Sequence, residues 1–253
     1  MTGDARALSS AERKELEDAI VAGATPDHLV VRALIALGAE PPERLARSTA
    51  MDREFIAAVR GYVDAGRIAA LMERRMNASE RLLETATARL VAGGGELSIA
   101  EVARDAGIAR RTLHRRYTAP ELIVACRRRA MTVWRTRFVH RVLAGDGAPE
   151  HRLFRTVDVL AEWVASERFR AEFALWTALS NTPQGDDLRD HLEAIATFAE
   201  RLAQHSGLGD PAGFGAFVAT SAAGASAWFD RRDAARAAAN AYVTFTLRAT
   251  QLP

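Results

Sequence analysis

The chain lacks the features that mark secreted, disulfide-bonded and membrane proteins. Its 253 residues include a single cysteine, Cys126, so no disulfide can form within the chain, as is usual in a reducing cytoplasm. No apolar signal-peptide stretch opens the sequence, and the longest uncharged run, 211–229, is mostly Ala, Gly, Ser and Thr. We therefore expect a cytoplasmic protein without a signal peptide or a membrane span, in which residues 211–229 form a buried helix.

The chain also lacks the spaced residue pairs of metal sites and the motifs of common enzymes. Its six histidines form no H-x-x-x-H or H-E-x-x-H pair, and no G-x-S-x-G or phosphate-binding loop is present. The acidic group at 186–193 fits a helix start, where the helix dipole favours carboxylates. Arg127–Arg129 follow Cys126 and make a redox-sensing thiolate conceivable, but we favour a structural cysteine. We predict no catalytic residue, no metal ligand and no cofactor, and therefore a protein that is not an enzyme.

What the chain has in quantity is helix-forming residues. Apolar residues make up 49% of it, largely Ala and Leu, and long β-branched runs are absent. The length of 253 residues is enough for two or three modules with a substantial core. No internal repeat is evident in the sequence. The composition predicts an all-α protein.

Residues 98–122 contain the most informative pattern. Ser98 and Glu101 have the S-x-x-E spacing of a capping box, and apolar residues then fall on one helix face at Ile99, Val102, Ala103 and Ala106. Gly107 follows this stripe, and glycine adopts the left-handed backbone conformation that ends a helix at a lower cost than any other residue. This order predicts a short helix, a glycine turn and a second short helix, which is the arrangement of a helix-turn-helix.

The second short helix is expected to present positive side chains to a DNA groove. Ile108 and Leu113 can pack back onto the first helix, which leaves the remaining positions facing outward. Arginine suits guanine edges, whereas hydroxyl groups suit phosphates. The predicted DNA-binding residues are Ser98, Arg110, Arg111, Thr112, His114, Arg115 and Tyr117.

The charge distribution supports a polyanionic partner at this place. The chain as a whole carries only +2, but residues 104–141 hold 11 arginines and 2 acids. Residues 1–73 carry −3 and residues 142–253 carry −4. A positive block on the motif, between acidic flanks, is the electrostatic pattern of a nucleic-acid-binding protein. Arg135, Arg137 and Arg141 lie far along the next helix and are expected to face solvent or acidic residues.

Residues 77–122 resemble the TetR family of bacterial transcriptional regulators. The resemblance rests on the segments ASERLLETATARLVAGG and LSIAEVARDAGIARRTLHRRY, in which a glycine turn, a short helix and an aromatic residue follow one another. It implies that Tyr117 contacts the phosphate backbone. It also implies a C-terminal helical bundle that binds a small inducer and that forms a dimer through its last two helices.

Residues 1–74 precede this motif and carry several helix signals. A capping box at Ser9 and Glu12, a nearly wholly apolar run over 27–37 and an amphipathic stripe over 55–63 predict at least three helices. Two interpretations are open, namely a second helix-turn-helix and a helical cap or protein-contact module. The net charge of −3 over residues 1–73 and the lack of an arginine-lined second helix favour the latter. We expect this extension to fold away from the DNA.

Residues 123–253 are predicted to form the ligand-binding and dimerisation domain. Few charges interrupt its apolar stripes, so the effector implied by the resemblance is expected to be largely apolar. The candidate ligand-binding residues are Trp163, Phe173, Trp176, Phe198 and Phe217. The last two predicted helices, 211–229 and 231–250, are rich in small residues that allow close packing. Because a helix-turn-helix that reads two half-sites needs two copies, we favour a homodimer over packing within one chain.

The sequence therefore predicts a ligand-responsive transcriptional regulator whose DNA-binding domain is 75–122. In its simplest form it is a repressor that a small, largely apolar molecule releases from a palindromic operator. Its expected partners are double-stranded operator DNA, the effector and a second copy of the chain. The alternative is a helical protein-interaction module whose N-terminal extension recruits a protein partner and whose DNA binding is weak.

Overall fold

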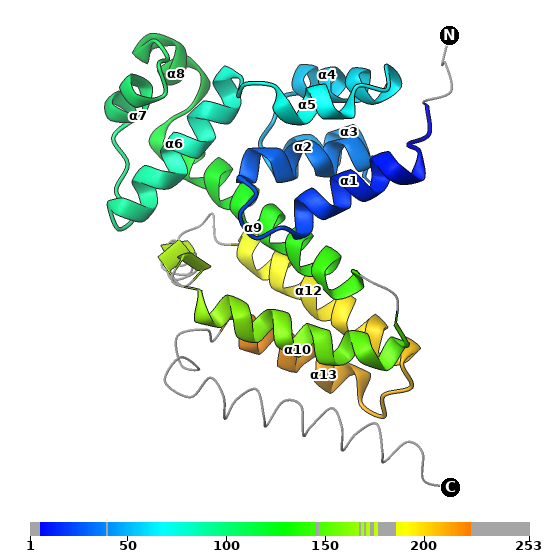
Figure 1. The fold of residues 1–253 in the computed structure, drawn as a ribbon. Coiled ribbons are helices and arrows are strands. Elements are labelled where there is room, and N and C mark those ends of the chain that lie inside the picture. The colour runs from blue at the N-terminus through cyan, green and yellow to red at the C-terminus, as the bar shows by residue number, and fades with distance from the viewer. Residues whose placement is uncertain are drawn as a thin grey trace, which may run out of the picture. The chain divides into compact units, whose positions relative to one another are not determined.

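The computed structural model describes residues 6–38, 40–144, 147–166, 168–169, 171–172, 175–176 and 186–223, and every regular element in these ranges is helical (Figure 1). The predicted all-α class is confirmed. The chain divides into two compact units, Met1–Arg137 and Phe138–Pro253. The extension and the segment 75–122, which the sequence separates, belong together to the first unit.

The described residues of the extension form five helices: α1 (Ser10–Val21), α2 (Asp27–Leu37), α3 (Pro42–Thr49), α4 (Arg53–Asp64) and α5 (Ile68–Glu73). The predicted capping box opens α1, since Ser9 Oγ accepts from the Glu12 amide at 3.2 Å and the Glu12 carboxylate accepts from the Ser9 amide at 2.9 Å. α2 is the centre of the extension, and its residues 30–36 are all buried, as its apolar sequence requires.

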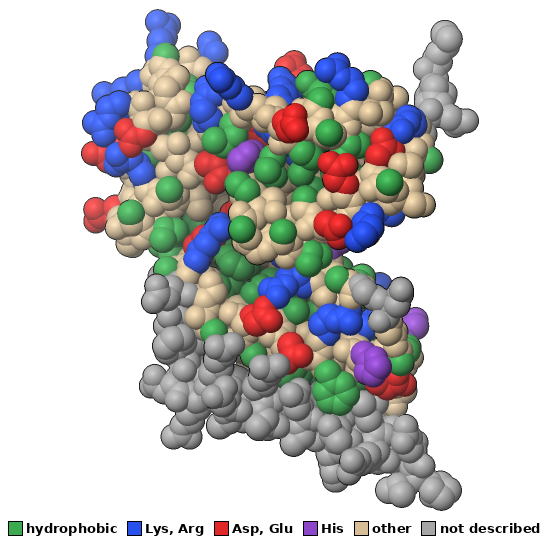
Figure 2. Space-filling view, in the orientation of Figure 1, with side chains coloured by type: hydrophobic (Ala, Val, Ile, Leu, Met, Phe, Trp, Pro, Cys, Tyr) green, Lys and Arg blue, Asp and Glu red, His purple; other side chains and the backbone are tan. Residues whose placement is uncertain are grey.

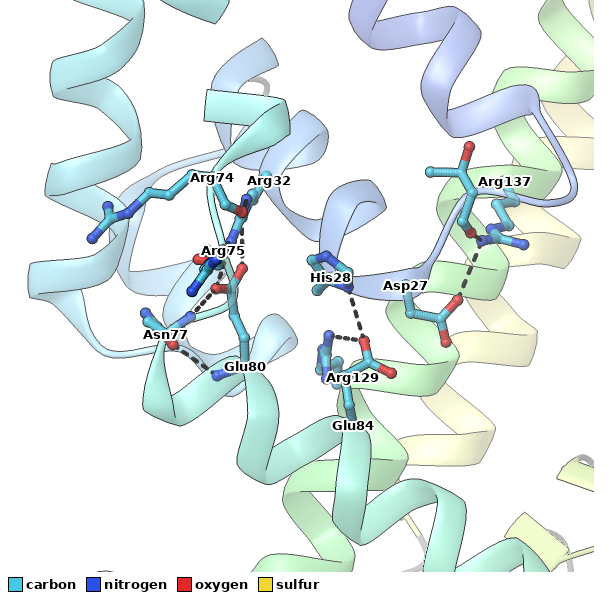
Figure 3. Close-up of polar contacts among 11 residues, drawn as sticks. Asp27, His28, Arg32, Arg74, Arg75, Asn77, Glu80, Glu84, Arg129 and Arg137 are labelled. Carbon is cyan, nitrogen blue, oxygen red and sulfur yellow. Dashed lines mark hydrogen bonds and ion pairs between the residues drawn. The ribbon is translucent and has the colours of Figure 1, made fainter. Parts of the chain in front are cut away.

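One charged side chain, Arg32, lies in this buried part of α2. Its side chain is 1% exposed, and its guanidinium donates to both carboxylate oxygens of Glu80 at 2.7 and 2.8 Å (Figure 3). Its other N–H groups bind the backbone carbonyls of Leu71, Arg74 and Arg75. A buried ion pair is tolerated when all of its donors and acceptors have partners, and all five Arg32 donors do. The pair fastens α2 of the extension to the start of the next helix.

That next helix is α6 (Ala78–Ala92), which is followed by α7 (Ile99–Asp105), α8 (Arg110–Arg116) and α9 (Ala119–Leu143). A capping box opens α6, because Asn77 Oδ1 accepts from the Glu80 amide at 2.8 Å and the Glu80 carboxylate accepts from the Asn77 amide at 2.8 Å. A similar contact caps α9, where the Thr118 amide donates to the Glu121 carboxylate at 2.7 Å.

The first part of α9 holds the extension and α6 together. Arg129 donates to Glu84 of α6 at 2.7 Å, and Arg137 reaches Asp27 at the start of α2 at 3.2 Å (Figure 3). Burial raises the pKa of Glu84, but its contacts with His28 and Arg129 outweigh burial and bring the pKa to about 2. Three segments that are distant in sequence are thus joined by charged side chains.

The described part of the second unit contains α10 (Pro149–Ala165), α12 (Asp186–His205) and α13 (Pro211–Ala223), which pack against one another. Residues 168–169, 171–172 and 175–176 are also helical. Residues 224–253, which include most of the predicted dimer helices, lie outside the described residues. No helix in the described part of the chain is long and apolar enough to cross a membrane.

Candidate nucleic-acid interface

The turn between α7 and α8 has the conformation that the sequence predicts. Gly107 is left-handed, with a φ of 65°, and the amide of Ile108 donates back to the Ala103 carbonyl at 2.9 Å. Val102 of α7 is 0% exposed and Leu113 of α8 is 1% exposed, so the two helices meet through buried apolar side chains. These contacts fix which face of α8 points outward.

The outward face of α8 carries the predicted base-contacting residues. Arg110, Arg111, Thr112, His114 and Arg115 are all exposed, and Leu113 alone in the helix is buried. Nε of Arg110 donates to the ring Nε2 of His114 at 3.2 Å, which links successive turns of the helix. The prediction that these side chains face outward is confirmed. Figure 2 shows Lys and Arg side chains gathered over this corner of the first unit.

Tyr117 ends α8 and is half-buried, and its amide still donates to the Leu113 carbonyl at 2.9 Å. The guanidinium of Arg116 lies 5.5 Å from the centre of the Tyr117 ring. Arg116 also donates to Ser79 of α6 at 2.9 Å and to Asp52 before α4 at 3.3 Å. Arg116 is absent from the predicted DNA-binding residues, because only its long-range partners distinguish it from the other arginines of α8.

Ser98 begins α7 as an N-cap, with its Oγ accepting from the Glu101 amide at 3.4 Å. The return contact of the predicted capping box is replaced, because Glu101 binds Arg89 of α6 at 2.6 Å. Arg89 also binds Asp105, and hydrogen bonds from Arg89 and Arg104 lower the pKa of that carboxyl. Ser98 is exposed and keeps its hydroxyl proton for an external acceptor.

Acidic side chains of the protein neutralise several arginines of the positive block 104–141, and the charge that remains exposed is concentrated on α8. Arg104 pairs with Asp105, and the distal arginines pair with acids of their own units: Arg135 with Glu40, Arg137 with Asp27 and Arg141 with Glu162. Arg127 and Arg129 are buried. Arg116 pairs with Asp52, but Arg110, Arg111 and Arg115 of α8 are exposed and form no ion pair with a carboxylate among the described residues. A polyanion therefore meets its strongest attraction on this face of α8.

The second unit gathers several of the predicted ligand-binding aromatics. Trp163 is buried and packs on Phe138 at 5.3 Å and on Phe169 at 5.2 Å between ring centres, and Phe198 lies 6.0 Å from Phe138. Trp176 is fully buried, Phe217 is half-buried beside Phe214, and Phe173 lies outside the described residues. Phe138 joins Trp163 to Phe198 but is absent from the predicted set, since it lies on the preceding helix.

Cys126 is buried, and this burial raises the pKa of its thiol to about 12. The thiol is protonated at neutral pH despite the adjacent arginines, which agrees with the structural role that we favour over redox sensing. Among the described residues, no three His, Cys, Asp or Glu side chains lie close enough to hold a metal ion. The side chains of Asp186 and Asp187, at the start of α12, are outside that set.

Comparison with known proteins identifies no relative. A scan against protein-family models, a search of curated proteins and a search of solved structures each find no match for this chain.

Proposed function

We propose that this protein is a DNA-binding transcriptional regulator in which α7, the Gly107 turn and α8 form a helix-turn-helix. The observation that carries the proposal is the face of α8. One buried leucine holds the helix to α7, and every other residue from Arg110 to Arg115 is exposed. A short, rigidly held helix of this charge has the properties needed to enter a major groove.

The side chains on this face have separate roles in the proposal. Arg110, Arg111 and Arg115 are suited to bidentate hydrogen bonds with guanine O6 and N7, which carry sequence information. Ser98, Thr112 and Tyr117 are suited to phosphate oxygens, which fix the register of the protein on the duplex. Arg116 acts as a positioning residue, because its contacts with Ser79 and Asp52 hold the end of α8 in place.

The regulatory part of the proposal concerns the second unit. We assign it the binding of a small, largely apolar effector, supported by the aromatic group of Trp163, Phe169 and Phe198. Effector binding is proposed to release a repressor from its operator. A homodimer through the small-residue helices is proposed to present two copies of α8 to a palindrome. Most of these helices lie outside the described residues, so this part rests on the sequence and on the TetR resemblance.

The test begins with selection of bound sequences from random double-stranded DNA by the full chain. The proposal expects enrichment of one palindromic motif. Arg111→Ala should weaken binding to that motif by about 1–3 kcal/mol and relax the preference at one position of each half-site. Arg201→Ala is the matched control, since Arg201 is an exposed arginine on α12 and should leave binding unchanged. Selection without enrichment, or equal effects of the two variants, would show that α8 does not read DNA.

A further inference from the structure

The structure contains a repeat that the sequence does not reveal. α3 begins at Pro42 and α4 at Arg53, whereas α7 begins at Ile99 and α8 at Arg110. A single offset of 57 residues therefore carries both helix starts of the first pair onto those of the second. Residues 44–60 align with 101–117 without a gap, and their few identities include Arg53 with Arg110.

The turn residues correspond as well. The offset carries Ala50 onto Gly107, and Ala50, with a φ of 56°, is the one non-glycine residue of the described chain that has a positive φ. Alanine adopts the left-handed conformation at a cost that glycine avoids, so the packing of α3 against α4 must impose it. Both helix pairs thus turn at the same residue and in the same conformation.

Many of the buried and exposed positions match, although Phe55 and Val59 of α4 are buried where Thr112 and Arg116 of α8 are exposed. Leu45 and Ile56 are buried like their counterparts Val102 and Leu113. Four positions of α4 are exposed where the corresponding positions of α8 are exposed, namely Arg53, Glu54, Ala57 and Ala58. The helix that precedes α3 and α4 in the chain, α2, packs against α4 and α5. The outward face of α4 is therefore the counterpart of the DNA-facing side of α8.

The chemistry of the two outward faces differs. Glu54, Ala57 and Ala58 stand where α8 has Arg111, His114 and Arg115, so α4 has little with which to read bases. Positive charge lies instead at the far end of α4. Arg67 and Arg74 place their guanidinium groups 5.4 and 5.8 Å from the centre of the Tyr62 ring, and both are exposed, as is Arg75. No carboxylate in the described part of the chain forms an ion pair with these three arginines, whereas Arg53 at the start of α4 lies 4.0 Å from the carboxylate of Glu43.

The two outward helices lie on the same side of the first unit. Figure 1 shows α4 and α8 along one edge of this unit, and Arg116 at the end of α8 contacts Asp52, the N-cap of α4, at 3.3 Å. Figure 2 shows blue side chains along that edge over both helices. A duplex held by α8 therefore has α4 and α5 within reach of its flanking backbone.

We propose that α3 and α4 form a second helix-turn-helix that binds the phosphate backbone of the same DNA beside the site read by α8. Arg53, Arg67, Arg74 and Arg75 are assigned as its phosphate contacts. The inference rests on the proposed function of α8, and it replaces the expectation that residues 1–74 lie away from the DNA. Phosphate contacts raise affinity for every sequence alike, so the second motif lengthens the footprint without changing the preferred sequence.

The experiment compares two double variants of the full chain on the DNA selected by the unmodified protein. Arg67→Gln/Arg74→Gln removes two assigned contacts, and Arg13→Gln/Arg201→Gln removes the same charge from other exposed sites. Equal thermal midpoints verify that both variants fold. Losing two phosphate contacts lowers the slope of log affinity against log salt by about 1.8. The affinity lost between 50 and 200 mM salt should then be about 12-fold smaller than in the control.

The footprint and the sequence preference give independent readouts. Hydroxyl-radical footprinting of the Arg67→Gln/Arg74→Gln variant should lose protection at the flank of the site, while the ratio of affinities for selected and scrambled DNA stays constant. A slope and footprint equal to those of the control would overturn the inference and leave the extension as a surface for a protein partner. A changed preference would also overturn it. If Arg111→Ala has no effect either, the proposed function itself fails, whereas an effect of Arg111→Ala alone removes only the second motif.

Discussion

The buried pair Arg32–Glu80 makes a quantitative prediction about what holds the first unit together. Glu80→Ala removes the carboxylate that accepts two charge-assisted hydrogen bonds, and it leaves the guanidinium of Arg32 with 1% exposure and no counter-charge. Breaking a buried pair in this way costs about 3–5 kcal/mol, and loss of the Glu80 part of the capping box adds up to about 1 kcal/mol. The carbonyls of Leu71, Arg74 and Arg75 still bind Arg32, so we expect about 3 kcal/mol.

A loss of this size is a large fraction of the 5–15 kcal/mol typical of domains, so the measurement is well within range. Urea unfolding gives the free energy, and hydrogen exchange of peptides from α2 and α6 locates the loss. Glu73→Ala is the matched control, because Glu73 is exposed at the end of α5 and forms no ion pair within the described residues. The double variant Arg32→Leu/Glu80→Leu should recover part of the stability, since no unpaired charge remains.

Two results would refute this prediction. One is a loss in the free energy of unfolding for Glu80→Ala that is no larger than the loss for Glu73→Ala, and the other is unchanged hydrogen exchange in α2. The prediction also bears on truncation. A chain that starts at Met76 loses Arg32 and the carbonyls that surround it, so deletion of the extension destabilises α6 along with the motif that follows. Point variants are therefore the cleaner way to separate the extension's role in folding from its role on DNA.

Four further predictions follow from individual side chains. Because contacts lower the pKa of Glu84 from 4.5 to about 2, its ionised form stabilises the fold above pH 4.5, and this contribution is lost as the pH falls toward 2. Glu84→Gln should therefore make the free energy of unfolding less dependent on pH over that range. Equal acid sensitivity of the variant and the unmodified protein would contradict this. The Cys126 thiol, with a pKa of about 12, should react with a thiol reagent only on unfolding, and rapid labelling of the folded protein at pH 8 would contradict its burial. Tyr117→Phe should weaken binding to all DNA sequences equally by about 1 kcal/mol, whereas a sequence-dependent loss would assign Tyr117 to base contact. Ala238→Glu, at a position outside the described residues, should yield monomers in sedimentation, and an unmodified chain that is already monomeric at micromolar concentration would rule out the dimer.

Local sequence signals predicted much of the first unit. The capping box at Ser9, the apolar helix over 27–37 and the turn at Gly107 are all present where the sequence predicts them. These features depend on residues a few positions apart, so a single sequence contains the information that specifies them. The outward face of α8 was predictable for the same reason, because one buried leucine sets the phase of a short helix.

Long-range features were missed. The run over 27–37 reads as an apolar helix, and nothing near Arg32 in the sequence indicates that its partner is Glu80, 48 residues later. The short helix α5 has no cap hydrogen bond and was not predicted. A second helix-turn-helix was one of the two interpretations left open for residues 1–74, but the repeat of α3–α4 and α7–α8 was not predicted. Burial and backbone conformation are largely shared while most side chains differ, with Ala50 in place of a glycine. Tertiary packing, which single-sequence patterns do not contain, decides each of these features.

The central claim is that α8 reads DNA sequence, and the most direct test is the ratio of affinities for selected and scrambled duplexes at one salt concentration. The account predicts a ratio of about 1000 or more for the unmodified chain, because specific regulators exceed their own non-specific binding by at least that factor. Arg111→Ala should reduce the ratio about 5- to 150-fold, which corresponds to 1–3 kcal/mol, and Arg201→Ala should leave it unchanged. A ratio near one for the unmodified chain, or a ratio that Arg111→Ala leaves intact, would contradict the account.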